Sequence, residues 1–326
     1  IYMSIFDKRI NILPYEYPDL LKYKDAIRHS YWIESEYNFT TDISDYYTKT
    51  TDLEKDVIKK TMLAIAQIEV SVKTFWADMY KKMPIAEIGD VGMTFAESEI
   101  RHKDAYAKLI TVLGLQKEFE TVVEIPAIKN RIKYLDKYLS GSRSGDNKMY
   151  TKSVLLFSLF IEHVSLFSQF LIMMSFNKDK NLFKGISNVV EATSKEEDIH
   201  GNFGAEIINI IKNEFPEWFD EDFDNLIYSA CEKAYSAECE ILDWIFEKGE
   251  LDFISKDQIK EFIKNRFNNS LNKINLKDLF KINTELLEST LWFDVEISST
   301  KEGDFFYKKS IDYNKKSKSI TENDLF

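Results

Sequence analysis

Histidine is scarce in this 326-residue sequence, yet two of its four histidines stand in the same local pattern. The pattern is Glu-x-x-His, which occurs at Glu99 and His102 and again at Glu197 and His200. On a helix, residues three positions apart share a face, so a carboxylate oxygen and an imidazole nitrogen can bind one ion from the same side. A single tetrad could equally be a solvated helical face, but two of them indicate a metal site.

Each tetrad is preceded by a glutamate inside an apolar stretch. These glutamates are Glu69, in Ala-Gln-Ile-Glu-Val-Ser-Val, and Glu162, in Phe-Ile-Glu-His-Val. Either one alone would be read as a surface carboxylate or as half of a local ion pair. Together with the two tetrads, they reproduce the ligand set of dimetal carboxylate helical bundles.

The spacing of these glutamates gives an independent check. Glu69 and Glu99 each lie fifteen residues from Pro84, where a helical hairpin is expected to turn. At 1.5 Å per residue both stand roughly 22 Å from that turn, so they meet at the same height. Glu162 and Glu197 are likewise nearly symmetric about a polar turn between them. Two hairpins are therefore expected to bring the four glutamates together.

Four carboxylates that converge in an apolar bundle require cations, because a buried carboxylate without a partner is costly. Oxygen-rich ligation with one imidazole per ion suits iron or manganese better than structural zinc. The other two histidines, His29 and His163, are expected to be structural.

The elements that must position these residues are helices. Only five prolines and ten glycines interrupt the chain, and no proline follows Pro216. This composition favours long helices over a β fold with many turns, so the expected fold class is all-α. Apolar residues recur with a 3.6-residue period in several segments. The expected helices cover 53–75, Pro84 to 113, 128–139, 153–176, a stretch through His200, 220–248, 256–270 and 276–290.

Three regions follow from this pattern. Residues 1–50 contain Pro14 and Pro18, which break any early helix, and are expected to form an arm laid over the main body. Residues 51–297 are expected to form the helical metal-binding domain. Residues 298–326 are rich in Lys, Ser, Asp and Asn and have no sustained periodicity, so they are expected to be a flexible tail.

One segment, 153–176, is apolar and long enough to raise the question of a membrane span. Glu162 and His163 lie in its middle, where ionisable groups would be costly in a bilayer. A buried core helix of a bundle can be apolar all round and still carry one functional carboxylate, so no membrane is expected.

The charge and the cysteines exclude other classes of function. A formal net charge of −12 repels phosphate backbones, so nucleic acid is not an expected partner. Cys231 and Cys239 offer neither a disulfide framework nor a CxxC site, and they are expected to be ordinary thiols. The N-terminus lacks the layout of a secretion signal, and a cytoplasmic location is expected.

From about Trp32 to its C-terminus the sequence resembles the small subunit of class I ribonucleotide reductases. The resemblance rests on three motifs: Ser-Glu-Ile-Arg-His-Lys-Asp-Ala-Tyr (98–106), Ile-Glu-His-Val-Ser-Leu-Phe (161–167) and Lys-Glu-Glu-Asp-Ile-His (195–200). It implies a ferritin-like dimetal bundle with extra helices. It also implies that one metal is held by Glu69, Glu99 and His102 and the other by Glu162, Glu197 and His200, with some carboxylates bridging.

The resemblance also implies roles beyond the ligands. Tyr106 falls where the family carries its radical tyrosine, although by position alone it would be read as a core aromatic. Trp32 matches the tryptophan of the radical-transfer route, with Glu196 beside it where the family usually has aspartate. Gly-Asp-Phe-Phe (303–306) followed by Tyr313 resembles the tail in which a tyrosine relays oxidation to the large subunit. The final residues 322–326 would dock on that subunit.

Two departures from the family pattern bear on the metal. Glu69 stands where the first ligand of the family is usually aspartate. Glu196 replaces the aspartate that the family usually has beside the tryptophan of the radical-transfer route. A glutamate at the first position occurs in manganese-using subgroups, and the mixed manganese-iron subgroup usually lacks the tyrosine that Tyr106 retains. The combination is most similar to the dimanganese subgroup, class Id. Two manganese ions are therefore expected, with di-iron and mixed manganese-iron centres as alternatives.

The activity that the resemblance implies is that of a radical- or oxidant-generating small subunit, active only with a large subunit and expected to be a homodimer. Two rivals use the same ligand frame. One is a stand-alone dimetal oxidase or desaturase, which needs a substrate cavity and no partner-binding tail. The other is a ferritin-like metal store, whose subunits are usually much shorter.

Overall fold

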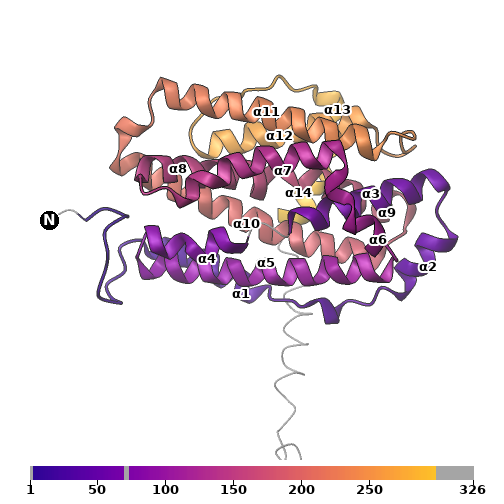
Figure 1. Ribbon diagram of the computed structural model, residues 1–326, viewed down its shortest axis with the longest axis horizontal. Helices are drawn as coiled ribbons and strands as arrows, with labels where there is room; N and C mark the ends of the chain where they lie inside the picture. The colour runs from indigo at the N-terminus through magenta and orange to yellow at the C-terminus, as the bar shows by residue number, and fades with distance from the viewer. Residues whose placement is uncertain (1–2, 70–72, 299–326) are drawn as a thin grey trace, which may run out of the picture.

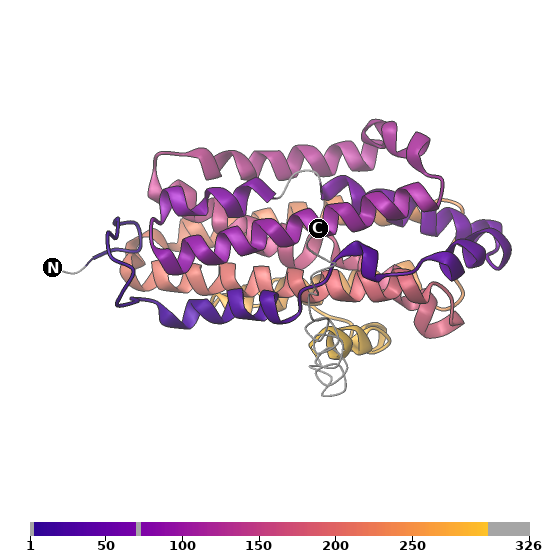
Figure 2. The same ribbon diagram turned by 90° about the horizontal axis from the view of Figure 1, so that it is seen from below.

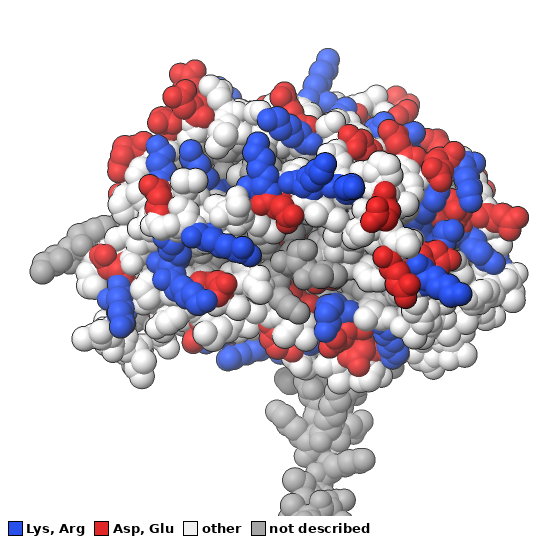
Figure 3. All heavy atoms as spheres, viewed as in Figure 1, with Lys and Arg blue, Asp and Glu red and all other residues white. Residues whose placement is uncertain are grey.

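The computed structural model describes residues 3–69 and 73–298 of the chain. Over these residues the secondary structure consists of helices and turns without strands, which confirms the all-α prediction. Figures 1 and 2 show the long helices running roughly along one axis of the molecule. On the face seen in Figure 3, Lys and Arg side chains are interspersed with Asp and Glu side chains, so neither sign of charge dominates it.

The centre of the fold is a bundle of four helical segments. Its members are α3 (Asp52–Ile68), α5 (Ala86–Val112), the continuous run α8 (Asn147–Leu156), η5 (Phe157–Ser165) and α9 (Phe167–Lys180), and α10 (Lys184–Glu214). The bundle segments contact one another through a core of apolar side chains. Five of the six ligand candidates lie on these segments, and the sixth, Glu69, directly follows α3.

Shorter helices and two longer ones surround the bundle. They are α1 (Leu21–His29), α2 (Thr40–Thr48), α4 (Lys73–Lys82), α6 (Gln116–Glu120), α7 (Pro126–Leu139), α11 (Glu221–Ile245), α12 (Lys256–Lys273), α13 (Thr284–Glu288) and α14 (Leu291–Ser298). Helices α1 and α2 lie in the region for which the sequence predicted only an arm. Helix α1 packs against α5 and α10, so this region is part of the folded body.

The predicted helix over 53–75 is wrong as a single element. A capping box between Thr51 and Glu54 starts α3, but α3 ends at Ile68, and α4 begins at Lys73. The apolar spacing does not reveal the end of α3, because α3 and α4 both pack against α5 and so carry the same helical period.

The apolar segment predicted over 153–176 is not a uniform α-helix. Its middle, η5, is a π-helix that carries Glu162, and π-helical turns are frequent at functional sites. The run 147–180 is the one described helix long and apolar enough to cross a bilayer, and its apolar window is completely buried by protein. Such burial is typical of the core helix of a soluble bundle.

Helix α10 approaches η5 closely through two glycines. A Cβ atom at Gly201 would overlap the ring of His163, and one at Gly204 would overlap Ser158. Because any larger side chain would push the two segments apart, these glycines set the distance between Glu162 on η5 and the ligand candidates on α10.

The helix predicted over 276–290 is wrong in its first half. Asn268 of α12 accepts hydrogen bonds from the backbone N–H groups of Leu279 and Phe280, both at 3.0 Å, and donates to the Phe280 carbonyl at 2.8 Å. These bonds use backbone groups that a helix would need for itself, so α13 begins only at Thr284.

Candidate metal centre

Six side chains from the four bundle segments converge at the middle of the fold. They are Glu69 just past the end of α3, Glu99 and His102 on α5, Glu162 on η5, and Glu197 and His200 on α10. Each of the six is at most 3% exposed. The structure therefore brings together the six residues that the sequence singled out, although α3 ends before Glu69.

The six residues form two overlapping groups, within each of which the possible ligand atoms lie within 4.8 Å of one another. One group consists of Glu69, Glu99, His102 and Glu197, and the other of Glu99, Glu162, Glu197 and His200. Glu99 and Glu197 belong to both groups. Two sites that share two carboxylates and have one imidazole each suit a pair of bridged metal ions.

Both histidines turn the same ring nitrogen toward the carboxylates. Nδ1 of His102 lies 3.0 Å from Glu197 and 3.6 Å from Glu99. Nδ1 of His200 lies 3.0 Å from Glu99 and 3.1 Å from Glu162. Nδ1 is therefore the nitrogen that each ring offers to an ion.

The opposite ring nitrogens have different partners. Nε2 of His102 lies 2.7 Å from Oε2 of Glu196, whereas Nε2 of His200 lies 2.8 Å from the Ser98 hydroxyl. Partners of this kind orient a ligating imidazole, and a carboxylate partner makes the ring more basic. The two halves of the centre are therefore unequal, with the stronger support on the His102 side.

Hydrogen bonding within the described chain does not satisfy this cluster. Both carboxylate oxygens of Glu69 are buried without a hydrogen-bond partner among the described residues. The oxygens of Glu99 and Nδ1 of His102 lie close to neighbouring ligand candidates but make no hydrogen bond of normal geometry. Burial is the largest cause, and the nearby carboxylates Glu197 and Glu99 the next, that raise the pKa of Glu162 well above its usual value. Burial is also the main cause that raises the pKa of Glu69. Buried carboxylates that protein hydrogen bonds do not satisfy fit cations.

Trp32 and Glu196 both reach the His102 side of the cluster. The Trp32 ring is stacked on His102, with centroids 5.9 Å apart and planes 11° apart. Burial alone would raise the pKa of Glu196, but hydrogen bonding from His102 and the nearby charge of Arg101 lower it below the usual value. Arg101, which donates to Glu196 at 3.0 Å, was not singled out from the sequence, although it lies inside the first Glu-x-x-His tetrad.

Tyr106 is fully buried one turn beyond His102 on α5. Its hydroxyl has no hydrogen-bond partner of normal geometry among the described residues. Burial, and then the charge of Glu69, raise the pKa of this phenol. The proposed relay tyrosine, Tyr313, and the docking segment 322–326 lie outside the described residues.

Neither of the remaining histidines joins the cluster. His163 is buried on η5, where its Nδ1 lies 3.2 Å from the Ser270 hydroxyl, and burial lowers its pKa to about 3. His29 is exposed in the last turn of α1.

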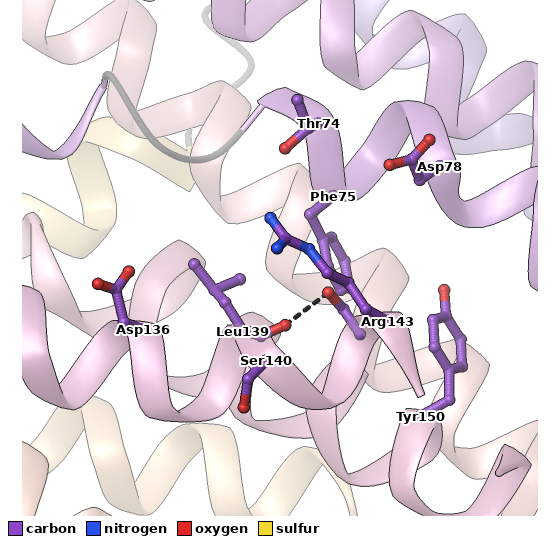
Figure 4. Close-up of a pocket in the computed structure, with 9 residues that line it drawn as sticks. Thr74, Phe75, Asp78, Asp136, Leu139, Ser140, Arg143 and Tyr150 are labelled. Carbon is purple, nitrogen blue, oxygen red and sulfur yellow. Dashed lines mark hydrogen bonds between the residues drawn. The ribbon is translucent and has the colours of Figure 1, made fainter. Parts of the chain in front are cut away.

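Two cavities lie between α7 and the segments around it. The larger one, of about 560 Å³, opens between α4, α7 and α8 and is lined by Phe75, Arg143 and Tyr150 among others, with no ligand candidate in its wall (Figure 4). The smaller one, of about 20 Å³, is lined by Ile68 and Ile161, the neighbours of two ligand candidates. That volume holds about one water molecule, so this cavity has no room for an organic substrate.

The sequence model of a family described as "Ribonucleotide reductase, small chain" matches residues 9–286. Among curated proteins, the chain is 22% identical to a probable ribonucleoside-diphosphate reductase small subunit (048L) of Invertebrate iridescent virus 3, over 97% of this chain and 87% of the viral protein. It is 24% identical to the ribonucleoside-diphosphate reductase small chain of Plasmodium falciparum (isolate Dd2), over 94% of this chain and 84% of that protein.

Solved structures share the fold. A ribonucleotide reductase R2 subunit from Clostridium botulinum superposes with a TM-score of 0.78 at 16% identity, over 87% of this chain and 89% of that one. The dimanganese(II) NrdF of Streptococcus sanguinis gives 0.72 at 16% identity, over 90% and 100% of the two chains. An R2-like ligand-binding oxidase with a Mn/Fe cofactor gives 0.70 at 18% identity, over 81% and 94%.

Proposed function

This chain belongs to the ribonucleotide reductase small-chain family, and from that premise we propose that it supplies a one-electron oxidising equivalent to a separate large subunit, which reduces ribonucleoside diphosphates. The observation that carries the proposal is the pair of overlapping Glu/His groups with Trp32 stacked on one of their histidines. A metal store needs the groups but not the stacked indole.

The six residues would hold two ions, with Glu69 and His102 on one, Glu162 and His200 on the other, and Glu99 and Glu197 shared between them. The bound metal pair supplies the oxidising equivalent. The protein's own groups orient and shield it: Glu196 and Ser98 hold the two imidazoles, and Trp76 donates to Glu162 at 2.8 Å.

We propose two manganese ions, as in the class Id subgroup. Glu69 at the first ligand position is the residue that favours manganese over iron here. The dimanganese and Mn/Fe cofactors named for two structural neighbours show that this fold accepts manganese in those proteins. Di-iron and mixed manganese-iron centres stay as alternatives, which metal analysis decides.

Trp32 would connect the metal centre to the large subunit. Glu196 would support this route through its contact with Nε2 of His102, on which the Trp32 ring is stacked. From Trp32 the oxidising equivalent would pass to Tyr313 in the tail and then to the large subunit, on which residues 322–326 would dock. Small subunits of this family are commonly dimers, and we propose a homodimer in the cytoplasm.

A stand-alone oxidase is the second candidate, because R2-like ligand-binding oxidases share the fold. Such an enzyme needs space for an organic substrate beside the metals. The cavity next to Ile68 and Ile161 has only about 20 Å³, so an oxidase would have to place its substrate elsewhere around the centre.

Reconstitution with iron and manganese present together tests the proposal. We expect two metal ions per chain, mainly manganese, and ribonucleotide reduction only when the large subunit is added. Metal content is measured by mass spectrometry and turnover by deoxyribonucleotide formation. Oxidation of an added organic substrate by the small subunit alone, without reductase activity in the mixture, would favour the oxidase instead.

Replacing Tyr106 by Phe distinguishes the phenol from the metal pair as the store of the oxidising equivalent. We expect the Tyr106→Phe protein to keep a metal-centred paramagnetic state and substantial turnover. The change removes one hydroxyl that has no hydrogen-bond partner of normal geometry among the described residues, so the structural perturbation is small. Electron paramagnetic resonance and turnover measure the outcome. An inactive variant with normal metal content and partner binding would assign the store to Tyr106.

A further inference from the structure

Arg101 is a buried cation that links three parts of the fold. Its guanidinium Nη1 donates to Oε1 of Glu196 on α10 at 3.0 Å and to the backbone carbonyl of Trp32 at 3.1 Å. Its Nε donates to Glu97, one turn earlier on α5, at 2.8 Å. Arg101 is only 3% exposed, and burying a guanidinium is costly unless it is paired. Its third nitrogen, Nη2, is buried without a hydrogen-bond partner among the described residues.

The Trp32 side chain makes no hydrogen bond of its own among the described residues. Its indole N–H is buried and has no hydrogen-bond partner among the described residues. Its ring lies edge-on to Tyr37, with centroids 5.6 Å apart, and parallel to His102. Ring contacts alone leave the position of a side chain loosely defined. A charge-assisted hydrogen bond to the backbone carbonyl of Trp32 fixes the position of its backbone and so restricts where the ring can lie.

The Arg101 guanidinium also lies near the aromatic rings of two consecutive residues, Tyr31 and Trp32, in the segment between α1 and α2. Its central carbon is 4.6 Å from the centroid of Tyr31 and 5.4 Å from that of Trp32. Such cation–π contacts add to the hydrogen bond from Arg101. The loop between α1 and α2 is thereby attached to the same carboxylate, Glu196, that supports His102.

We propose that Arg101 is a positioning residue that holds Trp32 in register with His102. The inference rests on the proposed function, in which Trp32 connects the metal centre with the partner. The hydrogen-bond partners of Arg101 among the described residues are Glu97, Trp32 and Glu196, none of which is a ligand candidate. It acts through Trp32 and Glu196, because one planar group sets the position of both relative to the His102 ring.

The geometry of the contacts requires arginine. Nη1 and Nε point to different partners, which a planar guanidinium with five donors reaches at once, whereas a lysine ammonium would reach only part of this set. Arg101→Lys is therefore expected to give an intermediate result and Arg101→Gln the full effect.

The test uses the full-length protein labelled with 5-fluorotryptophan. The chain has five tryptophans, and Trp32→Phe identifies the Trp32 signal in the fluorine spectrum. In Arg101→Gln we expect the Trp32 signal to move while the other four stay in place and metal content is unchanged. Turnover with the large subunit should fall by about 10- to 100-fold, the effect of a displacement of about 1 Å in a working site.

Lys108→Gln is the matched control. Lys108 lies two turns farther along α5 and donates to the backbone carbonyl of Glu34 at 3.2 Å, so it is a second cation that ties the same N-terminal region to α5. This variant should leave the Trp32 signal and turnover at wild-type values. If Lys108→Gln moves the Trp32 signal as far as Arg101→Gln does, the specific role of Arg101 is wrong.

An unmoved Trp32 signal in a folded Arg101→Gln protein overturns the inference, and so does a loss of metal that accounts for the lost turnover. If Arg101→Gln does not fold, the same measurement on Arg101→Lys decides. The role of Trp32 is tested separately: full turnover in Trp32→Phe would refute the proposed route, while the fluorine signal would still report whether Arg101 positions the ring.

Discussion

Replacing Glu197 by Ala is expected to leave a folded protein whose affinity for both metal ions falls by more than about 100-fold, since even the outer partners of metal ligands are worth about 10- to 100-fold. Glu197 belongs to both groups of ligand candidates. Its carboxylate oxygens lie 3.0 Å from Nδ1 of His102 and 3.4 Å from Nδ1 of His200. The change removes the carboxylate that we propose is shared by the two sites, so neither site would stay complete.

The fold itself should tolerate this change. Alanine favours the interior of a helix, and the change removes one of four carboxylates that repel one another in the absence of metal. Metal content per chain after gel filtration measures the loss. Wild-type protein should also gain thermal stability when manganese is added, because metal binds only the folded chain, whereas Glu197→Ala should not.

Two further variants make the result specific. Glu191→Ala removes a carboxylate from the same helix, where Glu191 pairs with Lys195 at 2.9 Å, and should bind metal like the wild type. Glu69→Ala removes a member of only one group and should lower occupancy mainly at that site. Two metal ions with wild-type spectra in Glu197→Ala would contradict the assignment of the centre.

Much of this fold could be predicted because helical periodicity is a local signal. The hairpin turn near Pro84 follows from apolar spacing, and so do the positions of α7 and α12, whose predicted bounds differ from the observed ones by at most three residues. Where prediction failed, the deciding interaction came from elsewhere in the chain. The segment 276–283 is not helical, because Asn268 of another helix takes its backbone groups. The π-helical turn at Glu162 leaves no mark in the sequence, because the segment is mostly apolar and all of its residues in η5 are buried, so no polar face reveals the helical period.

The candidate site shows the same division. The six ligand candidates could be found because metal binding needs particular residue types at a helical spacing. The residues that hydrogen-bond to the ligand candidates could not be predicted in this way, because the partner of an imidazole can be any polar residue from any element. Ser98 behind His200 and Arg101 behind Glu196 carry no such signature. The positive charge of Arg101, between the ligand candidates Glu99 and His102 in the sequence, is a signal that could have indicated its interaction with a buried carboxylate.

Removing residues 314–326 is expected to abolish turnover with the large subunit while metal content and helix content stay at wild-type values. These residues end in Glu-Asn-Asp-Leu-Phe, acidic and apolar groups suited to binding by folding on contact. Helix α14 ends at Ser298, fifteen residues before Tyr313, so the chain between them reaches at most about 50 Å. The truncation therefore removes the proposed docking residues and leaves the bundle untouched.

Tyr313→Phe is the matched variant for this truncation, because it removes the phenol and keeps the docking residues. We expect it to bind the large subunit with wild-type affinity and to lose turnover, whereas the truncated protein should lose both. A peptide of residues 314–326 should compete with the wild-type protein for the large subunit. Wild-type affinity in the truncated protein would remove the docking role, and normal turnover in Tyr313→Phe would remove the relay role. Since the two variants fail at different steps, binding and turnover measured side by side separate docking from oxidation.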